Sequence, residues 1–212
     1  MVYCLYKIDK NSITKYAIVM AKILYQAMKM TKQTLPTILN IQTIAKTRIF
    51  EVQQVDLRFS NGEERIYERL APQRRSSVMV LPIHQNQLVF VKEYAVGPER
   101  YELTFPKGIV DQGEQPIESA NRELQEEIGF AAKKITPLRS LYSGPSHMYG
   151  LMHVFVAEDL YPSSLEGDEP EPLEIIYYPL DKIDELLADP TFAEARNLST
   201  LFLLKDFLKA RA

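Results

Sequence analysis

The sequence predicts an α/β protein in which a mixed β-sheet lies between layers of helix. Two apolar runs, 78–83 and 88–94, have the length of buried strands, and residues 84–87 supply the turn between them. A segment that begins at Pro116 has the apolar period of a helix. Further elements follow: strands at 134–143, 152–157 and 174–178, then helices at 181–187 and 195–208. Strands and helices in this order favour a sheet between helical layers.

The last helix, 195–208, is amphipathic and ends the chain. Its large apolar side chains recur with helical spacing, so we expect them on or near the buried side: Leu198, Leu201, Phe202 and residues 204–208.

Residues 48–70 predict a β-hairpin ahead of this core. Apolar and polar residues alternate along 48–59, with the apolar positions at Phe50, Val52, Val55, Leu57 and Phe59. The Asn61-Gly62 pair is a strong hairpin-turn signal, and residues 63–70 form the return strand. A two-stranded hairpin is marginally stable alone, so a partner surface is expected for it.

The chain is therefore divided into three parts: residues 1–33, an N-terminal β appendage of residues 34–75, and the main domain of residues 76–212. Residues 1–33 carry six lysines opposed only by Asp9. Three interpretations of this basic extension stay open: a secretory signal interrupted by Lys22, a helix on a membrane surface, or translation from an upstream start with Met30 as the true first residue. We favour the last, so residues 1–33 are expected to be non-native or disordered.

Composition narrows the class of protein. The net charge of −3 argues against a nucleic-acid-binding surface. Cys4 is the only cysteine, which excludes an intrachain disulfide and fits a reducing compartment, here the cytoplasm. No run of 18 apolar residues exists, so no membrane-spanning helix is expected.

The most informative segment is 108–130, GIVDQGEQPIESANRELQEEIGF. Pro116 suits the first turn of a helix and Gly129 suits a left-handed residue at its end. The helix would bury one stripe of Ile117, Ala120, Leu124 and Ile128, and would aim Glu123, Glu126 and Glu127 along another.

Like charges one helical turn apart repel, so something cationic should offset the charge of this face. Arg122 can pair with one carboxylate, but a divalent cation would offset more. A solvated acidic helix face is the usual explanation of a charge run. Here the acids come with Gly108, Glu114, Arg122 and Gly129 at fixed intervals, and this combination favours a metal site.

The pattern resembles the signature of the Nudix hydrolases: Gly, five residues, Glu, seven residues, then Arg-Glu-apolar-x-Glu-Glu-x-Gly-apolar. The positions are filled by Gly108, Glu114, Arg122, Glu123, Leu124, Glu126, Glu127, Gly129 and Phe130. The resemblance implies an α/β/α sandwich that contains a mixed sheet. It also implies a homodimer, since the hairpin resembles the N-terminal appendage of the ADP-ribose pyrophosphatase branch of the family.

The resemblance also implies roles for the residues of the signature. Glu123 and Glu127 would be the principal metal ligands, Glu126 would contribute, and the backbone carbonyl of Lys107 would join them. Arg122 would orient Glu114. Hard oxygen ligands of this kind suit Mg²⁺ or Mn²⁺.

The general base is left open by the sequence. In the ADP-ribose pyrophosphatase branch it is often a glutamate on a loop after the signature, but the loop at 143–152 contains no carboxylate. The candidates are Glu126, Glu166, Asp168, Glu169 and, less favoured because a lone loop histidine is usually solvated, His147.

Stretches outside the signature, such as LPTILN, DLRFSNGEERIYER and KEYAVG, resemble bacterial hydrolases of ADP-linked compounds within the same branch. The resemblance implies cleavage of ADP-ribose, diadenosine triphosphate or NADH at a diphosphate bond, with release of AMP. Candidate substrate-binding residues are Tyr94, Tyr101, Glu102, Arg74 and Arg75. The alternatives are a silent module that binds ADP-ribose or NAD metabolites, and a hydrolase of another nucleoside diphosphate derivative.

Overall fold

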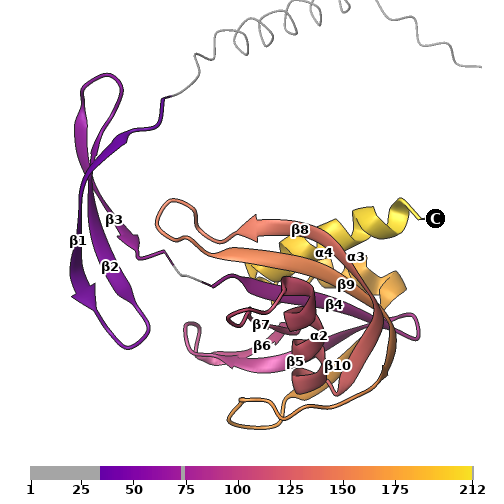
Figure 1. Ribbon diagram of the computed structural model, residues 1–212. Coiled ribbons are helices and arrows are strands. Elements are labelled where there is room, and N and C mark those ends of the chain that lie inside the picture. Colours follow the sequence, from indigo (N-terminus) through magenta and orange to yellow (C-terminus); the bar gives the residue numbers. More distant parts are fainter. Residues whose placement is uncertain (1–33, 73–74, 212) are drawn as a thin grey trace, which may run out of the picture. The chain divides into compact units, whose positions relative to one another are not determined.

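The computed structural model describes residues 34–72 and 75–211. The predicted extension at 1–33 and the candidate residue Arg74 lie outside them. The described chain contains two separate β-sheets and the helices that accompany the larger one (Figure 1).

The smaller sheet has three strands in the order β1-β2-β3: β1 (Thr37–Lys46), β2 (Glu51–Arg58) and β3 (Glu64–Leu70). The predicted hairpin is confirmed as β2 and β3, and Gly62 in its turn has a φ of 87°. Strand β1 was not predicted. It is exposed along its whole length, so no buried face gives its sequence the alternation that marks a half-buried strand.

The larger sheet has seven strands. They are β4 (Ser77–His84), β5 (Gln87–Ala95), β6 (Arg100–Thr104), β7 (Lys107–Ile109), β8 (Phe130–Tyr142), β9 (Leu151–Pro162) and β10 (Glu174–Pro179). Five run in the order β10-β5-β4-β9-β8, while β6 pairs with β5 and β7 with β4. Strands β4 and β9 pair in parallel, whereas β10 with β5, β4 with β5, β4 with β7, β5 with β6 and β8 with β9 pair antiparallel, so the sheet is mixed as expected.

Helices cover this sheet on both faces. They are α2 (Pro116–Glu127), the 3-10 helix η1 (Leu180–Lys182), α3 (Ile183–Ala188) and α4 (Ala195–Lys209). Val78 and Val80 of β4 pack in one core cluster with Leu124 of α2. Their neighbours on the strand, Met79 and Leu81, pack in a second cluster with residues of α3 and α4, such as Leu201. Because side chains alternate between the faces of a strand, the two clusters confirm the α/β/α sandwich (Figure 1).

Helix α2 begins at Pro116 and is followed by Gly129 with a φ of 70°, as its sequence predicts. Ala120, Leu124 and Ile128 of the expected stripe are buried. Ile117 is 44% exposed, so its assignment to the buried stripe was wrong. It lies in the first turn of α2, where the helix has only begun to cover the sheet.

The last helix is confirmed, but the prediction for Phe202 was wrong. Its side chain is 58% exposed, whereas Leu201 and Leu204 are fully buried. Strands β6 and β7 were also not predicted. Both are short, at five and three residues, and β7 pairs through only three residues of β4.

Candidate active site

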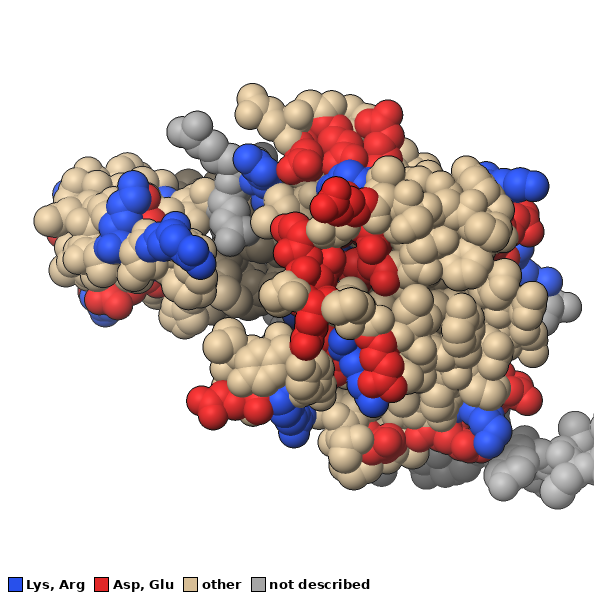
Figure 2. All heavy atoms as spheres, turned by 90° about the horizontal axis from the view of Figure 1, so that it is seen from below, with Lys and Arg blue, Asp and Glu red and all other residues tan. Residues whose placement is uncertain are grey.

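The residues of the 108–130 signature come together where β7, α2 and the segment after β9 meet. Together they line a cavity of about 780 Å³. Its lining contains eight acidic and three basic residues: Glu93, Asp111, Glu123, Glu126, Glu127, Glu166, Asp168 and Glu169, with Arg75, Lys107 and Arg122. Figure 2 shows acidic side chains gathered in a band across one face of the molecule.

Arg122 organises the carboxylates of the helix. Its Nη1 donates to Glu123 Oε1 and to Glu126 Oε2, at 2.7 Å in each case. Its Nε and Nη2 donate to Glu114, each at 3.2 Å, and Nη2 also donates to the carbonyl of Ile109 at 3.0 Å. Hydrogen bonds with Glu114 and the charge of Glu123 raise the pKa of Arg122 above its ordinary value, so the guanidinium stays charged.

Glu114 completes this arrangement without lining the cavity. Burial pushes its pKa upward, but hydrogen bonds from Arg122 and Ser119 outweigh the burial and hold the pKa of Glu114 below its ordinary value. Glu114 also accepts from the backbone N–H of Asp111 at 3.2 Å. The pair of Glu114 and Arg122 therefore ties the loop before α2 to the helix.

Glu123 and Glu127 are the buried carboxylates, with 6% and 8% of their surface exposed. Burial raises the pKa of Glu123 to about 7, although Arg122 opposes the rise. Burial raises the pKa of Glu127 to about 8, opposed by Lys107 and assisted by the charges of Glu123 and Glu169. Glu127 Oε1 accepts from the backbone N–H of Lys107 at 3.2 Å. Its Oε2 is buried and has no hydrogen-bond partner among the described residues.

Burial destabilises the ionised form of a carboxylate that has no positive partner. A divalent cation between Glu123 and Glu127 would supply that partner and would also satisfy Glu127 Oε2. Within residues 34–72 and 75–211, however, no three acidic, His or Cys side chains converge as they would around an ion. Arg122 Nη1 instead donates to both Glu123 and Glu126. The oxygen donors themselves are of the kind that a divalent cation prefers.

Gly108 leaves room for the carboxylate of Glu123. A Cβ added at Gly108 would lie 2.0 Å from Glu123 Oε1, so any other residue would have to displace this carboxylate from its contact with Arg122. The spacing of the signature from Gly108 to Glu123 thus corresponds to a close approach of the β7 backbone to the Glu123 side chain.

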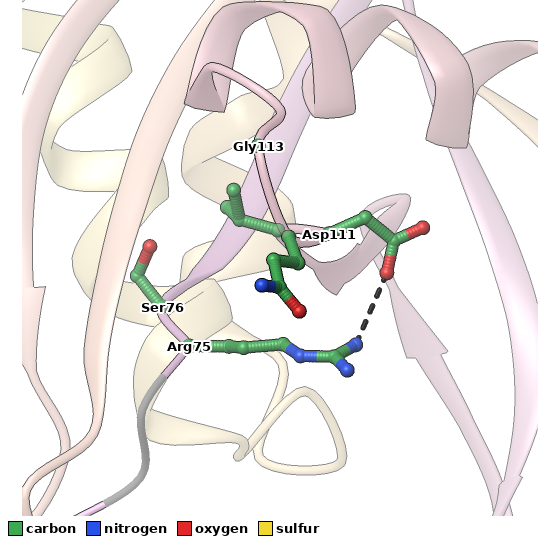
Figure 3. A pocket seen from close by; sticks show the side chains of 6 residues that line it. Arg75, Ser76, Asp111 and Gly113 are labelled. Atoms are coloured by element: carbon green, nitrogen blue, oxygen red, sulfur yellow. Dashed lines mark hydrogen bonds and ion pairs between the residues drawn. The ribbon is translucent and has the colours of Figure 1, made fainter.

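Lys107 and Arg75 each form an ion pair with an acidic residue of the same cavity. Lys107 Nζ pairs with Glu93 of β5. Arg75 Nη1 pairs with Asp111 at 3.2 Å, and both side chains are more than half exposed. Arg75 and Asp111 also border a second cavity of about 530 Å³, lined further by Ser76 and by Val110, Gln112 and Gly113 of the loop before α2. In Figure 3 the two charged side chains extend toward each other beside this cavity.

The structure separates the remaining candidates. Tyr94, Tyr101 and Glu102 do not line the acidic cavity; they lie on β5 and β6, where the two tyrosine rings meet edge to face with centroids 5.6 Å apart. Among the candidate bases, Glu126, Glu166, Asp168 and Glu169 line the cavity and His147 does not. Three of these candidates, Glu166, Asp168 and Glu169, lie on the loop between β9 and β10, residues 163–173. The loop at 143–152, which the family resemblance pointed to, contains no carboxylate. Sequence reasoning also missed Glu93 and Asp111, whose partners Lys107 and Arg75 are distant in the chain.

The comparisons with known proteins agree with this geometry. Residues 36–69 match the NudE-type Nudix hydrolase N-terminal domain, and residues 73–202 match the NUDIX domain. The chain belongs to the Nudix hydrolase family. Within this family, it is 53% identical over 176 residues to the ADP compounds hydrolase NudE of Escherichia coli K12, covering 83% of this chain and 95% of that protein.

This Nudix hydrolase has further relatives. It is 30% identical to an ADP-ribose pyrophosphatase of Bacillus subtilis over 178 residues, 80% of this chain and 96% of the relative. A crystal structure of an ADP compounds hydrolase superposes with a TM-score of 0.83 at 51% identity, covering 86% of this chain and 98% of that one. Among the described residues, no helix is long and apolar enough to cross a membrane.

The buried carboxylates predict how the stability of the cation-free Nudix hydrolase depends on pH. A glutamate whose pKa is raised in the folded state stabilises the fold while it is protonated. For Glu123 and Glu127 this contribution is complete below the ordinary glutamate pKa of 4.5, and it is lost as pH rises through about 7 and about 8, respectively. In EDTA, the free energy of unfolding is expected to fall between pH 5 and pH 8, by about 1.4 kcal/mol per pH unit for each group in its window. Thermal unfolding followed by circular dichroism measures this.

Glu127→Gln removes one titrating group and should make the fall shallower, whereas Glu185→Gln, on the exposed side of α3, should leave it unchanged. Added Mg²⁺ should stabilise the wild type more at pH 8 than at pH 5, because bound carboxylates are ionised. Equal slopes for the wild type and Glu127→Gln would show that burial of Glu127 does not control this dependence.

Proposed function

We propose that this Nudix hydrolase cleaves the diphosphate bond of ADP-linked compounds, such as ADP-ribose, diadenosine triphosphate and NADH, and releases AMP. The observation that carries the proposal is the pair of buried carboxylates, Glu123 and Glu127, with the unpartnered Oε2 of Glu127. The names of the relatives from E. coli and B. subtilis support the same class of substrate. The full set of acidic residues in the signature argues against a module that binds without turnover.

The cation is proposed to be Mg²⁺ or Mn²⁺, because the donors are all hard oxygens. Glu123, Glu127, Glu126 and the carbonyl of Lys107 would hold it. When bound, it would polarise a phosphoryl oxygen and lower the pKa of a coordinated water. Arg122 would hold the carboxylates of Glu123 and Glu126 in place through its two 2.7 Å contacts.

We infer that Glu169 is the general base that accepts the proton of the attacking water. Glu166 and Asp168 are exposed, whereas Glu169 is half-buried. Glu169 lines the same cavity as the two proposed ligands, and its charge raises the pKa of both Glu123 and Glu127. Glu126, the other strong candidate, is already engaged by Arg122.

The central prediction is that the purified protein with Mg²⁺ converts ADP-ribose to AMP and ribose 5-phosphate, and that EDTA abolishes the reaction. Glu127→Gln should lower kcat by more than about 100-fold, since a group that holds charge at the reacting phosphate is lost. Glu169→Gln should lower kcat by about 100-fold or more, as expected for loss of a general base. Product chromatography over a panel of ADP-linked and other nucleoside diphosphate compounds measures both activity and substrate class.

Glu185→Gln is the matched control for these variants and should keep the wild-type rate. Full activity of Glu127→Gln, or hydrolysis that is insensitive to EDTA, would contradict the proposed function. A panel in which a substrate without an ADP half reacts fastest would support the alternative hydrolase activity.

We propose that arginine and tyrosine side chains outside the signature hold the substrate. Arg75 is retained only by an exposed ion pair with Asp111, and exposed pairs contribute about 0–1 kcal/mol, so a phosphate can replace Asp111. Tyr94 and Tyr101 are 50% and 56% exposed and present aromatic surface for adenine. Glu102 follows Tyr101 on β6 and therefore faces the other side of the strand, where it lies opposite Glu93 of the acidic cavity and would contact the substrate from that side. Arg74, outside the described residues, is proposed from its sequence position to contact the adenine half of the substrate.

Arg75→Ala is therefore expected to raise KM for ADP-ribose by about 10-fold with little change in kcat, because binding of the intact substrate is weakened. Initial rates at varied ADP-ribose concentration measure the two constants. Arg65→Ala, which removes another exposed arginine from an ion pair, is the control and should leave KM unchanged. A fall in kcat with constant KM would place Arg75 in the chemical step instead.

We also propose that residues 34–75 are an appendage of the 76–212 domain that forms a homodimer in the cytoplasm. The small sheet exposes large apolar side chains on β1 and β3, namely Ile38, Leu39, Ile41, Ile66 and Tyr67. Exposed apolar surface of this kind is typical of a protein interface.

Light scattering on a size-exclusion column should give the mass of two chains for the wild type. Ile41→Glu should shift the equilibrium toward one chain, because it puts a charge into an apolar contact. Ile175→Glu, at an exposed position on β10, is the control and should leave the mass unchanged. A wild type that elutes with the mass of one chain would refute the homodimer.

A further inference from the structure

The acidic loop, defined as residues 163–173 between β9 and β10, carries Glu166, Asp168 and Glu169 into the cavity without regular secondary structure. A segment of this length loses considerable conformational entropy when it is ordered, so specific contacts must hold it in one place. Its far end is held by Leu173, which packs against the core cluster beneath α2, and by the hydrogen bond from Tyr101 to Glu171. The other end, which precedes Glu166, is held by separate contacts to α2.

The contacts at that end converge on the C-terminal half of α2. The antiparallel register pairs Phe130 with Pro162, so β9 ends beside the residue that follows the helix and its glycine. From there the backbone N–H of Ser163 donates to the carbonyl of Gly129 at 3.1 Å. The backbone N–H of Leu165 donates to the carbonyl of Gln125, also at 3.1 Å.

The side chain of Gln125 adds a third contact. Its Oε1 accepts from Ser163 Oγ at 2.8 Å, and its Nε2 donates to the carbonyl of Asn121 at 2.9 Å, which orients the amide. Asn121 Oδ1 accepts in turn from the backbone N–H of Ala132 at the start of β8. The side chains of Asn121 and Gln125 therefore tie strand β8, helix α2 and the acidic loop together.

Gln125 occupies a position of the signature to which no chemistry is assigned, yet it shares a helical turn with Glu123, Glu126 and Glu127. The loop crosses that turn closely, since a Cβ added at Gly167 would lie 3.5 Å from the carbonyl of Glu126 and 2.3 Å from Glu169 Oε2. The contacts of Gln125 thus hold the loop beside the turn that carries Glu123, Glu126 and Glu127, and Glu169 lines the same cavity as these carboxylates.

We propose that Gln125, through Ser163, is a positioning residue that holds the acidic loop on α2 so that Glu169 reaches the water attacking the diphosphate. This inference rests on the proposed function and adds to it a residue that acts through Glu169. Gln125 touches neither substrate nor cation, and its effect is on the rate of the chemical step.

The test combines kinetics with hydrogen exchange on the full-length protein. Gln125→Ala and Ser163→Ala should each lower kcat for ADP-ribose by about 10-fold, as is common when a residue that orients a catalytic group is removed. KM for ADP-ribose and the Mg²⁺ concentration that gives half the maximal rate should stay within about twofold. In mass-spectrometric hydrogen exchange, peptides covering 163–170 should exchange faster in both variants, while peptides from α4 should not change.

Three comparisons separate positioning from a general loss of structure. Ser163→Thr keeps the hydroxyl and should retain the wild-type rate. Ser164→Ala removes the neighbouring hydroxyl, which bonds only within the loop, and should also retain it. Gln125→Ala in a Glu169→Gln background should add no further loss, because a residue that acts through Glu169 has nothing left to position.

Unchanged exchange in the loop of Gln125→Ala would overturn the assignment of Gln125 as its anchor. Faster exchange with an unchanged kcat, or a full additional loss in the Glu169→Gln background, would overturn its role in catalysis. If the wild type fails to hydrolyse ADP-ribose, the proposed function fails, and the exchange of the loop still decides whether Gln125 holds it.

Discussion

The site depends on one electrostatic constraint: two carboxylates one helical turn apart are buried beside a single guanidinium. Arg122 contacts Glu114, Glu123 and Glu126 and leaves Glu127 with a buried oxygen that nothing in the described chain satisfies. Removal of ionised groups from water is costly, and the raised pKa values of Glu123 and Glu127 record that cost. A cation among these oxygens would offset it, so the cost of burying these carboxylates and their affinity for a divalent ion have the same origin.

The sheet brings the parts of the site together from distant segments. Strand β7 pairs with β4 and carries Gly108 against Glu123, where a larger residue would collide with the carboxylate. The parallel pairing of β4 with β9 and the register of β8 with β9 bring the acidic loop to the end of α2. Glu93 reaches Lys107 from β5. The acidic cavity is therefore built from one helix whose residues are close in sequence and from strands whose residues are not.

The two sheets differ in how they are stabilised. The larger sheet buries both faces beneath helices, and its central strands β4 and β5 contain fully buried Val, Leu, Met and Phe residues. The smaller sheet buries little beyond Val55 and leaves β1 exposed throughout. The Nudix signature lies with the larger sheet, and the smaller sheet carries exposed apolar side chains. This fits the proposal that the two parts of the chain serve catalysis and dimer formation separately.

The sequence by itself determined the elements that depend on local chemistry. Pro116, Gly129 and the period of the apolar residues delimit α2. Residues on one helix are neighbours by geometry alone, so the spacing of Glu123, Glu126 and Glu127 places them close together, whereas the contact of Arg122 with Glu114, which lies before the helix, was expected only from the resemblance to the family. It did not predict β1, β6 or β7, which have little buried periodicity, nor the exposure of Ile117 and Phe202, which depends on how far neighbouring elements extend. Only the tertiary structure decided which loop brings a carboxylate to the helix and that Gln125 anchors it, since those contacts join segments nearly 40 residues apart and no local pattern encodes them.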